Sequence, residues 1–298
     1  MSSGLLTPVQ LDAYRHDGYL TLRSLFTQEE ISLLRDTARR DRRLDEHAVS
    51  RADASGGASR LALWNKPGDD IYGMFARCGT MAELARQLLD DEPYHYHSKM
   101  IMKEPRVGGA WEWHQDYGYW YQNGLLMPSL CSVMIAVDPA TRENGCLQVI
   151  RGSQRMGRVD HVQNGDQAGA NAKRVEVALK RLELVYCELD PGDVVAFDCN
   201  TLHRSDANSS DHPRWSMICC YNARSNDPYE PSHHASYAPL SVVPRSSIVE
   251  AGRRLLADPS DGSGNASSDL LGPRRDRSAA RLESAGSASV TLRSNEET

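Results

Sequence analysis

The 298-residue chain lacks several features that identify broad classes of protein. Its start, MSSGLLTP, has neither the basic region nor the apolar region of a secretory signal. Its longest apolar runs, such as VMIAV at residues 133–137, are far too short to cross a membrane. No run of Lys and Arg forms a basic stripe, and the formal net charge is −6. We therefore expect a protein that binds neither a membrane nor nucleic acid.

The chain contains seven cysteines but no CxxC pair. An odd number of cysteines without a secretory signal is typical of a reducing compartment, so we expect a cytoplasmic location. There is also no internal repeat. The length suits one large β domain with helical additions, or two small domains.

The N-terminal part, residues 1–92, has mainly helical patterns. Thr7 followed by Pro8 predicts the start of a helix that ends near Gly18. Thr27, with Glu30 three residues later, predicts a second helix that begins with a capping box. Residues 19–26 alternate like a strand, and residues 81–89 have the pattern of a further helix. The small and polar residues 50–59 predict a mobile loop.

From Tyr94 the pattern changes to that of short β-strands. Runs rich in β-branched and aromatic residues are separated by Gly, Pro, Asp and Asn, with one helical exception at residues 171–184. This predicts a mainly β fold, a sandwich or jelly roll, with its core at residues 93–225. We expect residues 1–257 to form a single domain. The Ser-, Gly- and Arg-rich tail at 258–298 is predicted to be largely disordered, at most partly helical near 279–285.

The stretch WEWHQDYGYWY, residues 111–121, places His114 and Asp116 one residue apart. On a strand, residues at this spacing point to the same face. His203 comes much later, after the predicted strand GDVVAFD. Two histidines and a carboxylate form the facial triad of non-haem Fe(II) oxygenases, which leaves several coordination positions open. A zinc hydrolase can use the same residue types with a single open position. The HxD motif alone does not decide between them.

Two further residues favour the oxygenase. Arg214 begins the predicted strand RWSMICCYN, which follows the segment that carries His203. In a jelly roll such an arginine can reach back beside the metal, where its guanidinium can bind a carboxylate in bidentate fashion. Ser205 is close enough to His203 in sequence to donate a hydrogen bond to the same carboxylate.

Taken together, these motifs resemble those of the Fe(II)/2-oxoglutarate dioxygenases, and more narrowly the phytanoyl-CoA dioxygenase family, which includes ectoine hydroxylase. The resemblance rests on WHQD (113–116), RENGCLQVIRGSQRMG (142–157), PGDVVAFDCNTLHRSDANSSDHPR (191–214) and the N-terminal DGYLTLRSLFTQEEISLLR. It runs from about Leu11 to Ala223, and the motifs occur in the family's order. It implies a double-stranded β-helix (a cupin-like jelly roll) with flanking N-terminal α-helices. It also implies a hydroxylase that uses Fe(II), 2-oxoglutarate and O2 on a small-molecule substrate and releases succinate and CO2.

The resemblance also assigns roles to individual residues. The iron ligands are His114, Asp116 and His203. Because Asp116 stands where related halogenases have a small residue, hydroxylation is favoured. The residues that correspond to 2-oxoglutarate contacts are Arg214, Ser205, Met100, Met134 and Lys66.

The residues that contact the substrate are less constrained by the sequence. By strand alternation Trp113, Tyr117 and Tyr119 face away from His114, which predicts that they belong to the core. A loop-like stretch follows, and aromatic rings there can hold an apolar chain or a cation. The adjacent His233 and His234 are a weak candidate for another metal site. The candidate substrate contacts are Gln115, Trp120, Tyr121 and Asn65.

Two other functions stay open at this point. One is a cupin-like metal-dependent hydrolase or isomerase, which would have no need for Arg214 and Ser205 as a dicarboxylate anchor. The other is a non-catalytic jelly-roll binding module, which would have no need for an intact triad. The sequence leaves the substrate, the type of oxidation and the oligomeric state undetermined.

Overall fold

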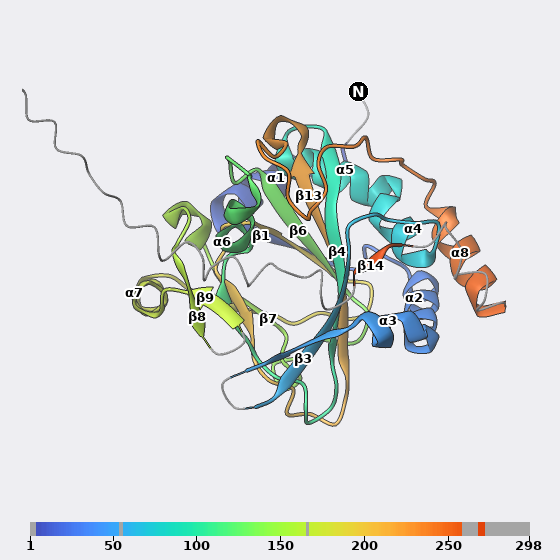
Figure 1. Cartoon of the computed structure of the whole chain (residues 1–298), viewed down its shortest axis with the longest axis horizontal. Helices are drawn as coiled ribbons and strands as arrows, with labels where there is room; N and C mark the ends of the chain where they lie inside the picture. The colour runs from blue at the N-terminus through green and yellow to red at the C-terminus, as the bar shows by residue number, and fades with distance from the viewer. Residues whose placement is uncertain (1–3, 54–55, 165–166, 258–267, 272–298) are drawn as a thin grey trace, which may run out of the picture.

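The computed structural model describes residues 4–53, 56–164, 167–257 and 268–271. Two β-sheets pack face to face around a shared apolar core, which is the expected double-stranded β-helix (Figure 1). The named strands of the described residues all pair antiparallel. In spatial order the eight-stranded sheet contains β1 (Tyr19–Leu22), β11 (Val194–Asp198), β6 (Leu130–Ala136), β13 (Arg214–Ala223), β4 (Pro93–Lys103), β3 (Ala58–Trp64) and β14 (Leu270–Leu271), with β2 (Val49–Ala52) paired to β3.

The second sheet is smaller and carries most of the motif residues. It has four strands, and the two in its middle each pair with two neighbours. A separate two-stranded hairpin lies beside it, formed by β8 (His161–Asn164) and β9 (Gln167–Ala170). In spatial order the four strands are β10 (Leu184–Cys187), β7 (Leu147–Ile150), β12 (His203–Ser205) and β5 (Trp111–His114).

Helices cover the outer face of the large sheet. The helices of the described residues are α1 (Pro8–Asp17), α2 (Gln28–Arg40), α3 (Arg42–His47), α4 (Ile71–Arg77), α5 (Gly79–Leu89), α6 (Asp116–Trp120), α7 (Ala172–Arg181) and α8 (Ser246–Ala257). Side chains from α2, α4, α5 and α8 form one apolar cluster with the sheet residues Met102, Val133 and Met217. Figure 1 shows α2, α4 and α8 together on this side, whereas α6 and α7 lie beside the small sheet. None of these helices is long and apolar enough to cross a membrane.

The helix signals in the N-terminal sequence are confirmed. Thr7 and Thr27 each cap a helix through a complete capping box, and Gly18 ends α1 in the left-handed conformation. The strand predicted at residues 19–26 is shorter, Tyr19–Leu22. Because β1 and β3 both belong to the large sheet, the helical N-terminal part is continuous with the jelly roll through shared strands.

The predicted loop at residues 50–59 is wrong at both of its ends. The chain there forms the end of β2 and the start of β3, and residues 54 and 55 lie outside the described residues. The small polar residues adopt strand geometry because β3 pairs with β4, which supplies hydrogen bonds that local composition does not reveal.

Part of the predicted disordered tail is ordered as well. Leu270 and Leu271 pair with β3, and the Asp269 carboxylate accepts hydrogen bonds from the backbone N–H groups of Asn65 and Lys66. The predictions for residues 258–267 and 272–298, including the helical stretch near 279–285, lie outside the described residues.

The alternation along β4 determines which residues reach the space between the sheets. Met100 and Met102 pack in the cluster beneath the helices. Lys99, Ile101 and Lys103 have the opposite parity and line the space between the sheets. Both faces of β4 are buried, so polarity along the strand does not distinguish them.

Candidate active site

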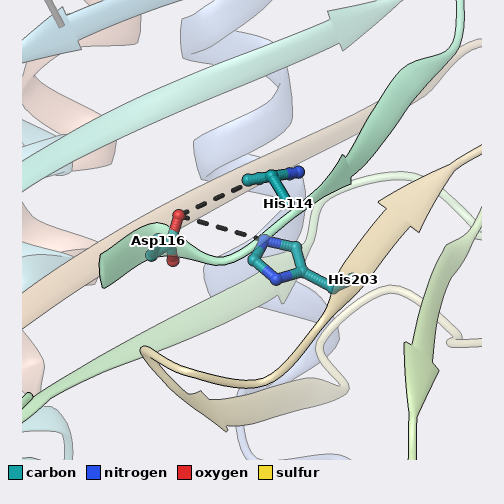
Figure 2. A group of neighbouring side chains, drawn as sticks. All are labelled: His114, Asp116 and His203. Carbon is teal, nitrogen blue, oxygen red and sulfur yellow. Dashed lines mark ion pairs between the residues drawn. The ribbon is translucent and has the colours of Figure 1, made fainter. Parts of the chain in front are cut away.

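Three sequence-predicted ligands meet at the edge of the small sheet (Figure 2). His203 begins β12 and is the direct partner of His114 at the end of β5. Asp116 begins α6, and its Oδ1 lies 4.0 Å from His114 Nε2 and 3.9 Å from His203 Nε2. The expectation that one strand carries both His114 and Asp116 is wrong, because the strand ends at His114. The three side chains nevertheless converge, with their possible ligand atoms within 4.8 Å of one another.

Hydrogen bonds behind the cluster orient each ligand. His114 Nδ1 donates to the carbonyl oxygen of Glu112 at 2.7 Å, and His203 Nδ1 donates to that of Thr201 at 2.9 Å. Each Nε2 is then left with its lone pair toward the cluster. The hydroxyl of Ser132 donates to Asp116 Oδ2 at 2.6 Å, which leaves Oδ1 to face the histidines.

The electrostatics of the cluster suit a metal ion. Burial lowers the pKa of His114 well below its ordinary value, and it also lowers the pKa of His203, although Asp116 opposes that shift. Both imidazoles are therefore neutral near pH 7, the form that binds metal. Two imidazole nitrogens and one carboxylate are the donor set of the non-haem iron triad. In the described part of the chain this is the single group of three or more such residues, and His233 and His234 are not in it.

A cavity of about 560 Å³ adjoins the cluster between the two sheets. His114, His203, Ser205, Met134 and Arg214 all line it. Arg214 is only 3% exposed, and its Nε is buried without a hydrogen-bond partner among the described residues. Its other nitrogens donate to the Ser216 hydroxyl and the Gly145 carbonyl oxygen.

Lys103 lines the same cavity and was missed in the sequence. It is the direct partner of Arg214 in the ladder between β4 and β13. Its Nζ donates to the carbonyl oxygens of Ser205, at 3.4 Å, and Asp206. Burial, and next the charge of Arg214, lower the pKa of Lys103 well below its ordinary value, and burial lowers the pKa of Arg214 to about 10. Two buried cations side by side fit a ligand that carries a carboxylate.

Two residues expected at the co-substrate are elsewhere. Met100 lies on the helix-facing side of β4, one residue out of phase with Lys99 and Ile101, so the expectation that it lines the co-substrate pocket is wrong. Lys66 is exposed beyond the end of β3 and lines neither cavity at the triad. The sequence signal for Lys103 was a lysine that shares the parity of Lys99 and directly follows the apolar residues 100–102.

A second cavity of about 650 Å³ also adjoins the triad and shares His114, Lys99, Leu61 and Trp111 with the first. Trp120, one of the expected substrate residues, lines it. Tyr119 lines it too, with its ring centroid 5.5 Å from that of His114. The prediction that Tyr119 faces away from His114 and into the core was wrong, because the chain turns into a helix after Gln115 and strand alternation stops there.

Three expected substrate residues lie outside this cavity. Gln115 is fully buried behind the triad, where its amide donates to the carbonyl oxygens of Gly157 and Asn200 and accepts from the backbone N–H of Val159. Its parity turns it away from His114, and its role is to cross-link three segments.

Tyr121 and Asn65 are displaced for different reasons. Tyr121 is 43% exposed, with the guanidinium of Arg158 stacked 4.5 Å from its ring centroid. Asn65 stands behind the cavity wall, where its amide donates to the His233 carbonyl oxygen at 2.6 Å and its Oδ1 lies 3.4 Å from His234 Nδ1. His234 itself lines the cavity.

The chain is similar to several known proteins. The family model "Phytanoyl-CoA dioxygenase (PhyH)" matches residues 14–216. An ectoine dioxygenase of Bordetella bronchiseptica is 30% identical over 260 residues, 80% of this chain and 83% of the relative. An L-proline trans-4-hydroxylase of Streptomyces griseoviridis is 29% identical over 234 residues, 73% of this chain and 87% of the relative. The crystal structure of EctD from S. alaskensis with bound Fe has a similar fold, with a TM-score of 0.67 at 24% identity over 82% of this chain and 90% of EctD.

Proposed function

Because the chain belongs to the phytanoyl-CoA dioxygenase (PhyH) family, it is an Fe(II)- and 2-oxoglutarate-dependent dioxygenase, and we propose that it hydroxylates a carbon of a small molecule at the His114–Asp116–His203 site. The observation that carries the proposal is that the two histidines of this triad line one cavity with the buried basic residues Arg214 and Lys103.

Each group has a distinct task. His114, Asp116 and His203 hold the iron, which when bound supplies the redox chemistry that couples the oxidation of 2-oxoglutarate to succinate and CO2 with oxidation of the substrate. Arg214 and Lys103 hold the distal carboxylate of 2-oxoglutarate.

Ser205 and Met134 complete the co-substrate cavity, where Ser205 supplies a hydroxyl and Met134 an apolar contact. The enclosure between two sheets excludes water from the reacting groups and fixes their separation.

Hydrolysis or isomerisation without 2-oxoglutarate is a weaker alternative. It would leave the basic groups of Arg214 and Lys103 adjacent and buried with no anion to bind, which is costly in a protein interior.

The names of the relatives bear on the size of the substrate. The names of the two relatives refer to ectoine and L-proline, and we propose a compound of similar size for the second cavity.

We also propose a cytoplasmic location for the protein, which is supported by the seven cysteines, all buried and free of disulfides.

The proposal is tested by anaerobic titration of the purified protein with Fe(II) and 2-oxoglutarate, followed in the visible charge-transfer band, and by succinate formation on addition of O2 and a metabolite extract. Wild type should form the band and produce succinate, and His114→Ala should form no band. Arg214→Met should weaken 2-oxoglutarate binding roughly 10- to 100-fold, the loss expected for a charged hydrogen bond, with little change in iron affinity.

A matched control is Arg253→Met, which removes an exposed arginine of α8 that pairs with Glu29. It should behave as wild type. A wild-type protein that forms no band and releases no succinate would rule out the proposed function.

A further inference from the structure

Lys99 is the one residue of β4 that lines both cavities at the triad. Its side chain is 19% exposed, and its Nζ lies 3.9 Å from Asp116 Oδ1, beyond hydrogen-bond distance. Its neighbours in the sheet are Leu63 and Ile218, both apolar. Within the described residues its ammonium has no other charged neighbour that could neutralise it.

The charges around Lys99 are unbalanced. Of the residues that the structure describes, Asp116 is the sole carboxylate that lines either cavity. In the loaded enzyme the three negative charges of Asp116 and 2-oxoglutarate do not exceed the positive charges of Fe(II), Arg214 and Lys103. Lys99 is then left without a counter-charge in a site largely closed to water, where an unpaired charge is costly.

Among the described residues Arg51 is the other strongly basic residue that lines the second cavity, and the surface of the cavity is mostly apolar. His97 lies beside Lys99, 2% exposed, and burial lowers the pKa of His97 well below its ordinary value, so its ring is neutral near pH 7. The ring of His97 stacks on His234 at 5.0 Å and meets the edge of Trp120 at 5.5 Å. Leu61 and Leu63 add apolar surface.

We infer that Lys99 binds a carboxylate of the substrate, so that the enzyme acts on small carboxylic acids of about amino-acid size. The inference rests on the proposed function and names the substrate class for that same site. A carboxylate carries the single negative charge that the Lys99 ammonium offsets. The hydrocarbon part of the acid packs against Trp120 and the leucines, which holds its C–H bonds near the triad.

The test uses pairs of L-amino acids and their primary amides, in which a neutral group of nearly the same shape replaces the carboxylate. L-Proline with L-prolinamide and ectoine are included in the panel. The readout is the stimulation of succinate formation by the iron- and 2-oxoglutarate-loaded enzyme. At least one acid should stimulate wild type, with its amide at least about 10-fold weaker in kcat/KM, the discrimination expected for a charged hydrogen bond.

Variants at Lys99 connect this selectivity to one side chain. Lys99→Met should lower kcat/KM for the acid roughly 10- to 100-fold and bring the ratio of acid to amide close to one. The KM for 2-oxoglutarate should change by less than about 2-fold, since Arg214 and Lys103 are intact. Lys99→Arg should recover part of the ratio. Lys180→Met, which removes an exposed lysine of α7 that lines neither cavity, should retain the wild-type ratio.

Three results would overturn the inference. In the first, amides stimulate as well as acids; in the second, no acid in the panel stimulates. In the third, Lys99→Met raises the KM for 2-oxoglutarate as much as that for the acid, which would make Lys99 a co-substrate anchor. Each of these results can be distinguished from failure of the proposed function by measuring the charge-transfer band in the absence of an amino acid or amide. If the band forms, the iron and 2-oxoglutarate sites are intact and only the inference about Lys99 is overturned.

Discussion

Single hydrogen bonds on the far side of the metal ligands decide which atoms face the iron. The Ser132 hydroxyl is fully buried and donates to Asp116 Oδ2, so that Oδ1 is the oxygen turned to the two histidines. The backbone carbonyls of Glu112 and Thr201 do the same for His114 and His203. The orientation of the three side chains, in addition to their identity, therefore distinguishes a metal site from motifs that occur together by chance.

Removing the Ser132 hydroxyl should therefore weaken the metal site. We expect Ser132→Ala to lower Fe(II) affinity by about 10- to 100-fold, because Asp116 loses the partner that holds its rotamer. Anaerobic Fe(II) titration measures the effect. Ser209→Ala, which removes an exposed hydroxyl that donates to the Glu143 carbonyl oxygen, serves as the control. Equal affinities for the two variants would show that Asp116 needs no support from Ser132.

The short helix α6 is the element that brings the second half of the HxD motif to the metal. It begins at Asp116 and carries Tyr119 and Trp120 to the second cavity. It packs closely on His161, because a Cβ on Gly118 would lie 1.9 Å from the Cε1 atom of His161. His161 has little freedom to move, since its Nε2 accepts from the Gln115 backbone N–H and its Nδ1 donates to the Val159 carbonyl oxygen.

Gly118→Ala should consequently displace α6. We expect the free energy of unfolding to fall by roughly 1–3 kcal/mol, as for other overpacked sites, together with a loss of Fe(II) affinity because Asp116 moves with the helix. Denaturant unfolding and Fe(II) titration measure the two effects.

Gly79→Ala is the matched helical control. Its new Cβ would be 3.9 Å from the nearest atom, a Val242 side-chain carbon, so it should fit without loss of stability. If Gly118→Ala behaved like Gly79→Ala, the contact between α6 and His161 would not position the site.

For the whole molecule, folding buries many histidines in neutral form. Burial lowers the pKa of His95 and of His161 to about 4. It also lowers the pKa of His97, His114 and His203. The five residues are His95, His97, His114, His161 and His203.

The sign of the resulting pH dependence follows from proton uptake. The unfolded chain binds protons as pH falls through about 6.5, whereas the folded chain keeps these histidines neutral until a lower pH. Stability is thus fully present above pH 6.5 and is lost as pH falls toward 4. Each histidine contributes a slope of up to about 1.4 kcal/mol per pH unit. Denaturant unfolding of the metal-free protein at a series of pH values from 7 to 5 measures this, and a flat profile would contradict it.

Much of the architecture followed from the sequence, because its signals are local. Thr7 and Thr27 predicted two helix starts through capping chemistry, and short β-rich runs predicted most strands of the jelly roll. The triad of His114, Asp116 and His203 was recognisable from residue types and motif order, and the structure places the three side chains together. Metal ligation needs particular side chains, so the amino-acid types in the sequence were enough to predict the three ligands.

Tertiary structure decided which face, partner and conformation each remaining residue has. Both sides of β4 are buried, so alternation there could not tell that Lys99 and Lys103 face the cavities while Met100 faces the helices. The chain leaves the strand at Gln115, which turned Tyr119 toward the site against the alternation rule. The strands at residues 49–52 and 58–64 depend on the pairing of β3 with β4, a segment distant in sequence. The sequence determines the chemistry of each side chain, but the direction in which a side chain points depends on packing against residues that are distant in sequence.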